Sequence, residues 1–132
     1  MTMKKHIDLS QLFELREKQQ NQLRDWWVPQ IGDLYTHNEA NHYYTIEERD
    51  GYIYYHALGL NVPDGMEYHK HIKSNCLPLL TICQMIELLN AENKRVSILS
   101  SGGEWEVFAQ PEHAAIEAEL CDALWKVVKQ VL

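Results

Sequence analysis

The chain has 132 residues, the length of one ordinary domain, and its 45% hydrophobic and 23% charged residues exclude the disordered and collagen-like classes. Its net charge of −7 argues against direct binding of nucleic acid, because neutralising phosphates requires a basic surface. Eight acids and a single base, Arg49, lie between Asp25 and Glu67, so the middle third of the chain carries the whole imbalance.

The chain has no recognisable targeting or membrane segment. Its start, MTMKKHIDLSQ, lacks an apolar signal region, and the longest apolar run, around Cys76 to Cys83, is too short to span a bilayer. The three cysteines form no CxxC pair, which is typical of a reducing compartment. We therefore expect a cytoplasmic protein with reduced thiols, no membrane attachment and no cofactor.

The first predicted element is a helix over Ile7–Trp27, with Asp8 or Ser10 available as its N-cap. Its stretch Arg16–Gln22 is polar all round. We therefore expect this N-terminal helix, within residues 1–28, to project into solvent or to meet another subunit. A homodimer is predicted on this ground.

Trp26 and Trp27 end this helix, and tryptophans in such a position are usually packing residues, although the pair could also form a stacking platform for a ligand. The following stretch, Gln30–Tyr35, is predicted to be a strand, because Gly32 and Asp33 favour a turn that leads into one.

The segment Tyr43–Leu58 has the strongest hairpin signal, because Asp50-Gly51 suits the positive φ angles of a two-residue type I′ turn. Pairing across this turn sorts the residues into two faces. The mostly apolar face holds Ile46 with Tyr55, Tyr44 with Ala57, and Glu48 with Ile53. The polar face holds Thr45 with His56, Glu47 with Tyr54, and Arg49 with Tyr52.

Five residues of the polar face are interpreted as a binding surface, here named the acidic tyrosine face: Glu47, Arg49, Tyr52, Tyr54 and His56. Tyrosine offers a large amphipathic contact area with few rotamers to restrict, and all seven tyrosines lie between Tyr35 and Tyr68. The alternative is structural, because tyrosine also favours strands and another element could cover this face.

Gly59–Asn75 is predicted to be a long loop that is either functional or mobile, because it contains Pro63, Asp64 and Gly65 and shows no periodicity. A less favoured interpretation of this segment is a metal site, since His69 and His71 with Cys76 are ligands suited to zinc. Three other histidines are available to complete it: His37, His42 and His56. The spacing matches no standard zinc finger, so scattered histidines on a solvated loop are the preferred interpretation.

Leu79–Leu89 is predicted to be the most buried helix, because it is apolar on nearly every side, and Thr81 and Gln84 form a capping-box pattern. A second hairpin is predicted from Lys94–Leu99 and Glu104–Ala109. Its turn is Gly102-Gly103, which sets Ile98 opposite Val107 and Ser100 opposite Trp105.

Pro111 is expected to open the approach to a final helix over Ala115–Leu132, whose apolar residues recur at helical spacing from Ile116 to Val131. One core is expected to contain Leu124, Trp125, Val107, Ile98, Met85 and Leu88. The elements together predict a single α+β domain over 1–132, in which an antiparallel sheet from two hairpins packs against two apolar helices, with an additional N-terminal helix.

Three stretches, DWWVPQIGDLY, LPLLTICQMIELL and ELCDALWKVVKQVL, resemble segments of small uncharacterised proteins encoded by phages and prophages of Gram-positive bacteria. The resemblance implies a phage-derived cytoplasmic protein and supplies no catalytic residues.

No local pattern indicates catalysis. Cys83 and Cys121 lie on apolar helix faces, where a cysteine usually behaves as a small buried hydrophobe. The Ser100–Gly103 loop lacks the GK[ST] ending of a phosphate-binding loop. We therefore expect a non-catalytic binding or accessory protein that acts on a partner protein. The alternative is a metal-dependent or hydrolytic enzyme that uses the His69–Cys76 loop.

Overall fold

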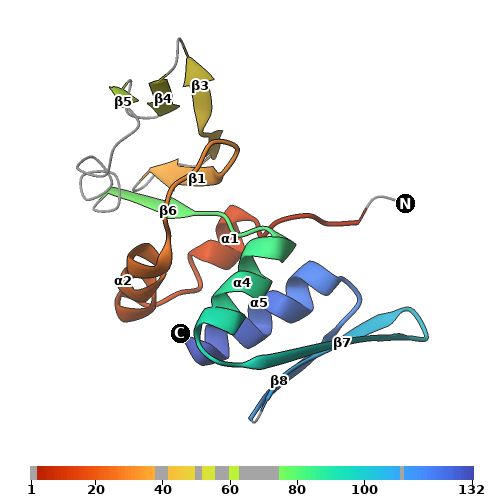
Figure 1. The fold of residues 1–132 in the computed structure, drawn as a ribbon. Coiled ribbons are helices and arrows are strands. Elements are labelled where there is room, and N and C mark those ends of the chain that lie inside the picture. Colours follow the sequence, from red (N-terminus) through yellow and green to blue (C-terminus); the bar gives the residue numbers. More distant parts are fainter. Residues whose placement is uncertain (1–2, 38–41, 50–51, 56–59, 63–74, 111) are drawn as a thin grey trace. The chain divides into compact units, whose positions relative to one another are not determined.

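The computed structural model describes residues 3–37, 42–49, 52–55, 60–62, 75–110 and 112–132 (Figure 1). The chain divides into two compact units, Leu9–Leu79 and Leu80–Leu132, and the first eight residues belong to the latter. We name them the 9–79 unit and the 80–132 unit. Helices and antiparallel strands make up both units, which confirms the predicted α+β class. The single domain over 1–132 stays a prediction.

The predicted helix Ile7–Trp27 is wrong in its middle, because two helices replace it: α1 at Leu9–Leu12 and α2 at Glu17–Trp26. The break lies at residues 13–16, where the N–H groups of Glu14 and Leu15 bond to the carbonyls three residues back and Arg16 has an extended backbone, whereas the polar stretch 17–22 is part of α2. The chain turns instead, and the side-chain oxygen of Gln19 accepts a hydrogen bond of 2.9 Å from the backbone N–H of Arg16, at the start of α2.

The first sheet of the 9–79 unit is centred on β1, Leu34–His37. It pairs antiparallel with β2, Tyr44–Thr45, and with β6, Cys76–Pro78. The strand predicted over Gln30–Tyr35 exists, but it begins later. Residues 30–33 form a turn, in which the N–H of Asp33 donates to the carbonyl of Gln30 at 3.1 Å.

The second sheet contains β3, Glu47–Arg49, β4, Tyr52–Tyr55, and β5, Leu60–Val62, in that order. The predicted register of the hairpin is confirmed for its three pairs nearest the turn. Those pairs are Glu47 with Tyr54, Glu48 with Ile53, and Arg49 with Tyr52. The turn Asp50-Gly51 lies outside the described residues.

Tyr44 and Thr45 pair with Tyr35 and Leu34 of β1, and their predicted hairpin partners, Ala57 and His56, lie outside the described residues. The predicted loop 59–75 is wrong at its start, where Leu60–Val62 forms β5 and pairs with β4. Residues 56–59 and 63–74 lie outside the described part of the chain.

The 80–132 unit contains one sheet of β7, Arg95–Ser101, β8, Glu104–Gln110, and β9, His113–Glu117, in that order. The second predicted hairpin is confirmed with its register, including Ile98 opposite Val107 and Ser100 opposite Trp105. Gly102 and Gly103 have φ angles of 61° and 84°, both positive as a type I′ turn requires.

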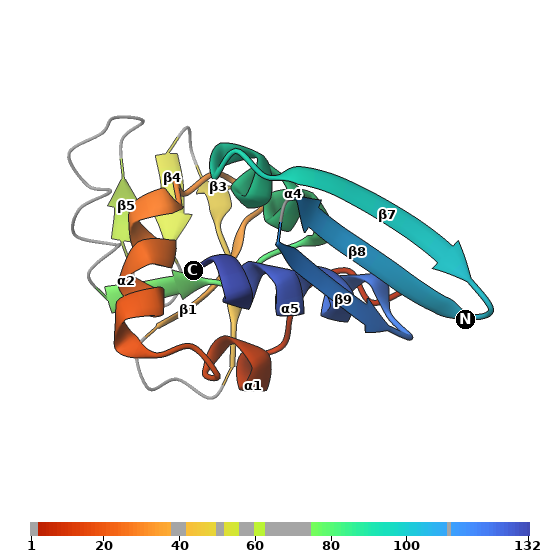
Figure 2. The ribbon, with the colours of Figure 1, turned by 90° about the horizontal axis from the view of Figure 1, so that it is seen from below.

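Two helices, α4 at Ile82–Ala91 and α5 at Leu120–Val131, lie on one face of this sheet (Figure 2). The capping box of α4 is confirmed, because the Thr81 hydroxyl accepts from the N–H of Gln84 at 3.2 Å and the Gln84 side chain accepts from the N–H of Thr81 at 2.9 Å. Both helices contribute to the core beneath the sheet.

The more buried helix is α5, and the prediction that α4 would be the most buried is wrong. Seven residues of α5 are buried against three of α4, and Cys83 of α4 is exposed rather than buried. Five of the six predicted core residues are confirmed as buried: Leu124, Trp125, Val107, Met85 and Leu88. Ile98 is half-buried.

The predicted helix Ala115–Leu132 is wrong at its start, because residues 113–117 form β9 and the helix begins at Leu120. Ala115 pairs with Val107 and Ile116 with Glu106, so the edge of β8 recruits this stretch into the sheet. Ile116 is 54% exposed and does not join the core stripe of α5. Pro111 lies outside the described residues.

Residues 3–8 complete the 80–132 unit. The N–H of Ile7 donates to the carbonyl of Leu80 at 3.0 Å, and the N–H of Ile82 donates to the carbonyl of Lys5 at 3.2 Å. Ile7 is fully buried. These residues belong to an extended segment rather than to the predicted first helix.

None of the helices in the described part of the chain has both the length and the apolar character that crossing a membrane would require.

Candidate functional site

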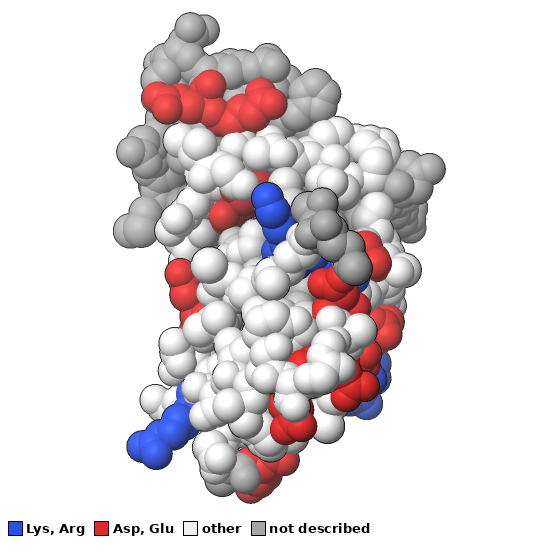
Figure 3. Space-filling model, turned by 90° about the vertical axis from the view of Figure 1, so that its right-hand side faces the viewer, with Lys and Arg blue, Asp and Glu red and all other residues white. Residues whose placement is uncertain are grey.

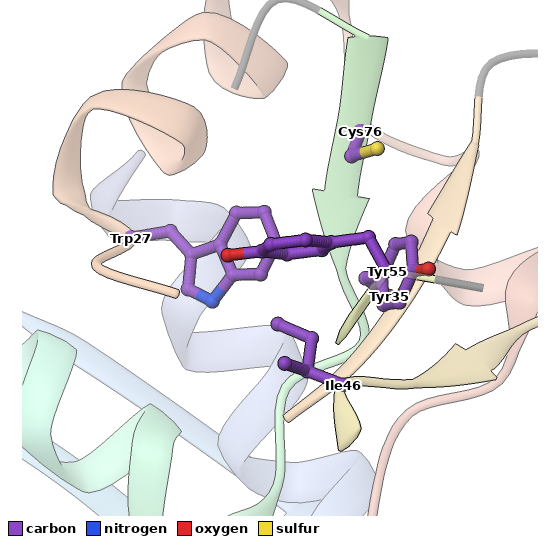
Figure 4. Packing of buried hydrophobic residues seen from close by; sticks show 5 residues of the cluster. All are labelled: Trp27, Tyr35, Ile46, Tyr55 and Cys76. Atoms are coloured by element: carbon purple, nitrogen blue, oxygen red, sulfur yellow. The ribbon is translucent and has the colours of Figure 1, made fainter. Parts of the chain in front are cut away.

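A buried aromatic cluster forms the core of the 9–79 unit, and Figure 4 shows its members: Trp27, Tyr35, Ile46, Tyr55 and Cys76. The rings of Tyr35 and Tyr55 meet edge to face, with centroids 6.0 Å apart and an interplanar angle of 77°. This geometry is favourable for aromatic pairs. The cluster joins the end of α2 to strands from both sheets of the unit, so it holds β3 and β4 against β1.

Asp33 fixes the orientation of Trp27. Its Oδ2 accepts a hydrogen bond of 2.9 Å from the indole Nε1 of Trp27 and another of 3.0 Å from the backbone N–H of Gln30. Trp27 is 1% exposed. The packing interpretation of this tryptophan is therefore confirmed, and a ligand-stacking role for Trp27 is wrong.

The acidic tyrosine face lies on the hairpin of β3 and β4. Glu47 is exposed, and the ladder pairs it with Tyr54 and pairs Arg49 with Tyr52. Residues paired across a ladder share a face, whereas neighbours along a strand alternate. The predicted set of four strand residues is therefore brought together by the backbone. The fifth, His56, lies outside the described residues.

The hairpin itself carries exposed acidic side chains. Glu48, next to Glu47, is also exposed. Figure 3 shows a group of acidic side chains at the top of the view, where Figure 1 draws β3 to β5. The structure thus agrees with the acidic character of residues 25–67.

A second group, on the segment that precedes the hairpin in sequence, was not predicted. The hydroxyl of Tyr44 is hydrogen-bonded to Nε2 of His42, and the two rings lie 4.7 Å apart between centroids. Thr36 Oγ1 donates to the carbonyl of His42 at 3.0 Å, which anchors His42 to β1. Both His42 and Tyr43 are exposed, Tyr43 by 47%. The run His42-Tyr43-Tyr44 before Glu47 was the available sequence signal.

The tyrosines between residues 35 and 55 differ in their burial. Tyr35 and Tyr55 are fully buried, whereas Tyr44 is half-buried and packs on the cluster from outside. Burial raises the pKa of Tyr55 to about 12, with smaller contributions from Tyr35, Cys76 and Asp33. Its hydroxyl is buried and has no hydrogen-bond partner among the described residues.

The alternative metal site is not assembled in the described part of the chain. The strand register brings His37 opposite Cys76, but Cys76 is fully buried. Burial raises the pKa of its thiol to about 11, against the lowering effect of Arg24, so the thiolate needed by a metal or a nucleophile is disfavoured. Residues 3–37, 42–49, 52–55, 60–62, 75–110 and 112–132 contain no cluster of three metal-ligating side chains. His69 and His71 lie outside these ranges.

The thiol of Cys121 is disfavoured as a nucleophile for the same reason. Cys121 is fully buried in α5, and burial raises the pKa of its thiol to about 11. The glycines at 102 and 103 form a hairpin turn, as their positive φ angles require, rather than a phosphate-binding loop.

No protein-family model, curated protein or solved structure matches the chain.

Proposed function

We propose that this chain is a non-catalytic, phage-derived cytoplasmic binding protein that recognises a basic surface of a partner protein through its acidic tyrosine face. The observation that supports this best is the hairpin register, which aligns Glu47 with Tyr54 and Arg49 with Tyr52. Tyrosine next to carboxylate is a combination suited to a contact surface that carries Lys and Arg.

The core beneath the hairpin supports the same proposal. Tyr55, the last residue of β4, and Ile46, directly before β3, are buried in the aromatic cluster, so the end of the hairpin away from its turn is held by packing. A hairpin held in this way loses less conformational entropy when it binds a partner. The exposed residues His42 and Tyr43 extend the surface along the preceding segment.

A double variant, Tyr54→Ala with Glu47→Lys, tests this proposal. It removes one aromatic contact and reverses one exposed charge on the same face. We expect an unchanged circular dichroism spectrum, and loss of proteins that the wild type retains from host lysate. A retained protein is then purified, and its affinity is measured by calorimetry at 50 and 200 mM salt. Binding to a basic surface should weaken at the higher salt.

The matched control is Glu87→Lys, which makes the same charge change at an exposed position of α4 in the 80–132 unit. The control should bind as the wild type does. Equal affinity of the double variant and the wild type would refute the proposal, as would equal loss in the control.

A further inference from the structure

At alternate residues of β7, backbone groups on the outer edge have no partner strand among the described residues. In a hairpin with a two-residue turn, the residues flanking the turn, Ser101 and Glu104, exchange hydrogen bonds, and every second pair repeats this pattern. The N–H and C=O groups of three residues therefore point away from β8: Val96, Ile98 and Ser100. The sheet order β7-β8-β9 leaves this side of β7 without a neighbouring strand in the described part of the chain.

The two edges of this sheet differ in how they are protected. At the β9 edge, the side-chain amide of Gln130 donates to the carbonyl of Ala114 at 3.2 Å, and Lys126 forms an ion pair with Glu117. β7 is longer and has an uninterrupted register of seven pairs, so it contains no bulge. It also contains no proline and no charge beyond its first residue, Arg95. Natural sheets rarely leave such an edge open, because it is a template for another strand.

The face of the sheet turned away from α4 and α5 carries exposed apolar side chains. Leu99 is 56% exposed and Ile116 is 54% exposed. Both pair with Glu106 of β8, one from each side, so the three residues form a row across the sheet. A strand added beside β7 would extend this row and cover Leu99.

We propose that β7 pairs antiparallel with β7 of a second copy of this chain, centred on Ile98, to form a continuous six-stranded sheet. This register pairs every residue of β7. It matches Val96 with the partner's Ser100 and Ile98 with the partner's Ile98, so that outward groups meet outward groups in about six hydrogen bonds. In this register odd-numbered residues lie opposite odd-numbered residues of the partner, and residues opposite one another point to the same face of a sheet. The helices of both copies therefore lie on the same side of the sheet.

Charge complementarity selects this occupant and this register. Arg95 lies opposite the partner's Ser101, which itself pairs with the partner's Glu104. Arg95 and Glu104 are both exposed and would lie on the same face, about 10 Å apart across two strand spacings, within reach of an arginine side chain. Within one chain they lie at opposite ends of the hairpin, about 20 Å apart, beyond the screening length at physiological salt. Two-fold symmetry makes the contact twice.

Amide hydrogen exchange gives a direct test, read together with the mass from sedimentation velocity over micromolar to millimolar protein. The amides of Val96, Ile98 and Ser100 should become protected as the dimer forms. The amides of Ser97 and Leu99 should be protected throughout, because they bond to β8. The proposal would be overturned if the amides of Val96, Ile98 and Ser100 exchanged rapidly in a dimer, or if they were protected in a monomer. A monomeric mass at all concentrations would overturn it as well.

Charge exchange provides a second test that does not depend on disturbing the strand. Arg95→Glu alone and Glu104→Arg alone should each raise the dimer dissociation constant about tenfold, because each dimer loses two favourable pairs. An equimolar mixture of the two variants should form a heterodimer of wild-type affinity. If the dissociation constant of the mixture were no lower than that of either variant alone, this register would be refuted.

Ser100→Pro blocks the edge itself. It removes an outward N–H while leaving the hydrogen bonds to β8, a position at which edge strands tolerate proline. The variant should be monomeric, with the unfolding midpoint that the wild type shows at concentrations where it is also monomeric, whereas the matched variant Ser100→Ala should dimerise as the wild type does. A folded Ser100→Pro variant that still dimerises would contradict the proposal.

Discussion

The buried hydroxyl of Tyr55 makes Tyr55→Phe an informative substitution. Tyr55 is fully buried, and its Oη has no hydrogen-bond partner among the described residues. Burying an unsatisfied hydroxyl costs about 1–3 kcal/mol, whereas phenylalanine keeps the ring contact with Tyr35. The variant should therefore raise the free energy of unfolding by about 1–3 kcal/mol, which is unusual for a core substitution.

The same hydroxyl predicts a difference at alkaline pH. The pKa of Tyr55 is raised to about 12 in the folded protein from its ordinary value of 10.0. The folded state therefore holds this proton more tightly, and the contribution to stability is complete below pH 10 and is lost as the pH rises from 10 to 12. Tyr55→Phe should lack this component of the alkaline loss.

Urea denaturation followed by circular dichroism, at pH 7 and at intervals above pH 9, measures both effects. Tyr43→Phe is the matched control, because Tyr43 is 47% exposed and its substitution should change the free energy of unfolding by less than about 0.5 kcal/mol. A destabilised Tyr55→Phe variant would refute the reasoning, since it would show that the hydroxyl is hydrogen-bonded in the folded protein.

Three other predictions concern the 80–132 unit and the thiols. Leu124→Ala should lower the free energy of unfolding by about 2–5 kcal/mol, because Leu124 is fully buried in α5; an unchanged denaturation midpoint would remove α5 from the centre of the core. Thr81→Ala should cost about 1 kcal/mol, because the hydroxyl caps Gln84 at the start of α4; Thr81→Ser should restore most of it. The thiol pKa values of Cys76 and Cys121, raised from 9.0 to about 11, should leave stability constant below pH 9 and reduce it as the pH rises from 9 to 11. Replacing both cysteines by alanine should remove the loss between pH 9 and 10, below the range in which Tyr55 contributes, and its persistence there would assign the loss to other groups.

The two hairpins could be predicted with their registers because each depends on a local rule. A two-residue turn determines which residues pair, so Gly102-Gly103 was enough to place Ile98 opposite Val107. The capping box of Thr81 and Gln84 is local in the same sense.

The errors arose where distant partners decide the local structure. The sequence HAAIEAEL contains strong helix formers, and only pairing with β8 makes its first part a strand. In the candidate site, Glu47 and Tyr54 could be paired from the turn alone. The contact between His42 and Tyr44 is local, but the anchoring of His42 could not be predicted, because it depends on a hydrogen bond from Thr36 of β1.

The bonds of residues 3–8 give the 80–132 unit a dependence on the order of synthesis. The backbone N–H of Lys4 donates to Glu119 at 3.3 Å, and its Nζ donates to Asp122 at 2.7 Å, across 115 and 118 positions of sequence. In sequence, the whole 9–79 unit is thus an insertion between two parts of the 80–132 unit. It can fold while the ribosome is still translating α5, whereas the segment around Lys4 must wait for that helix. A fusion partner at the N-terminus would therefore affect the docking of residues 3–8, which is the last step of folding. A fusion partner after residue 132 would affect α5, the helix on which that segment docks.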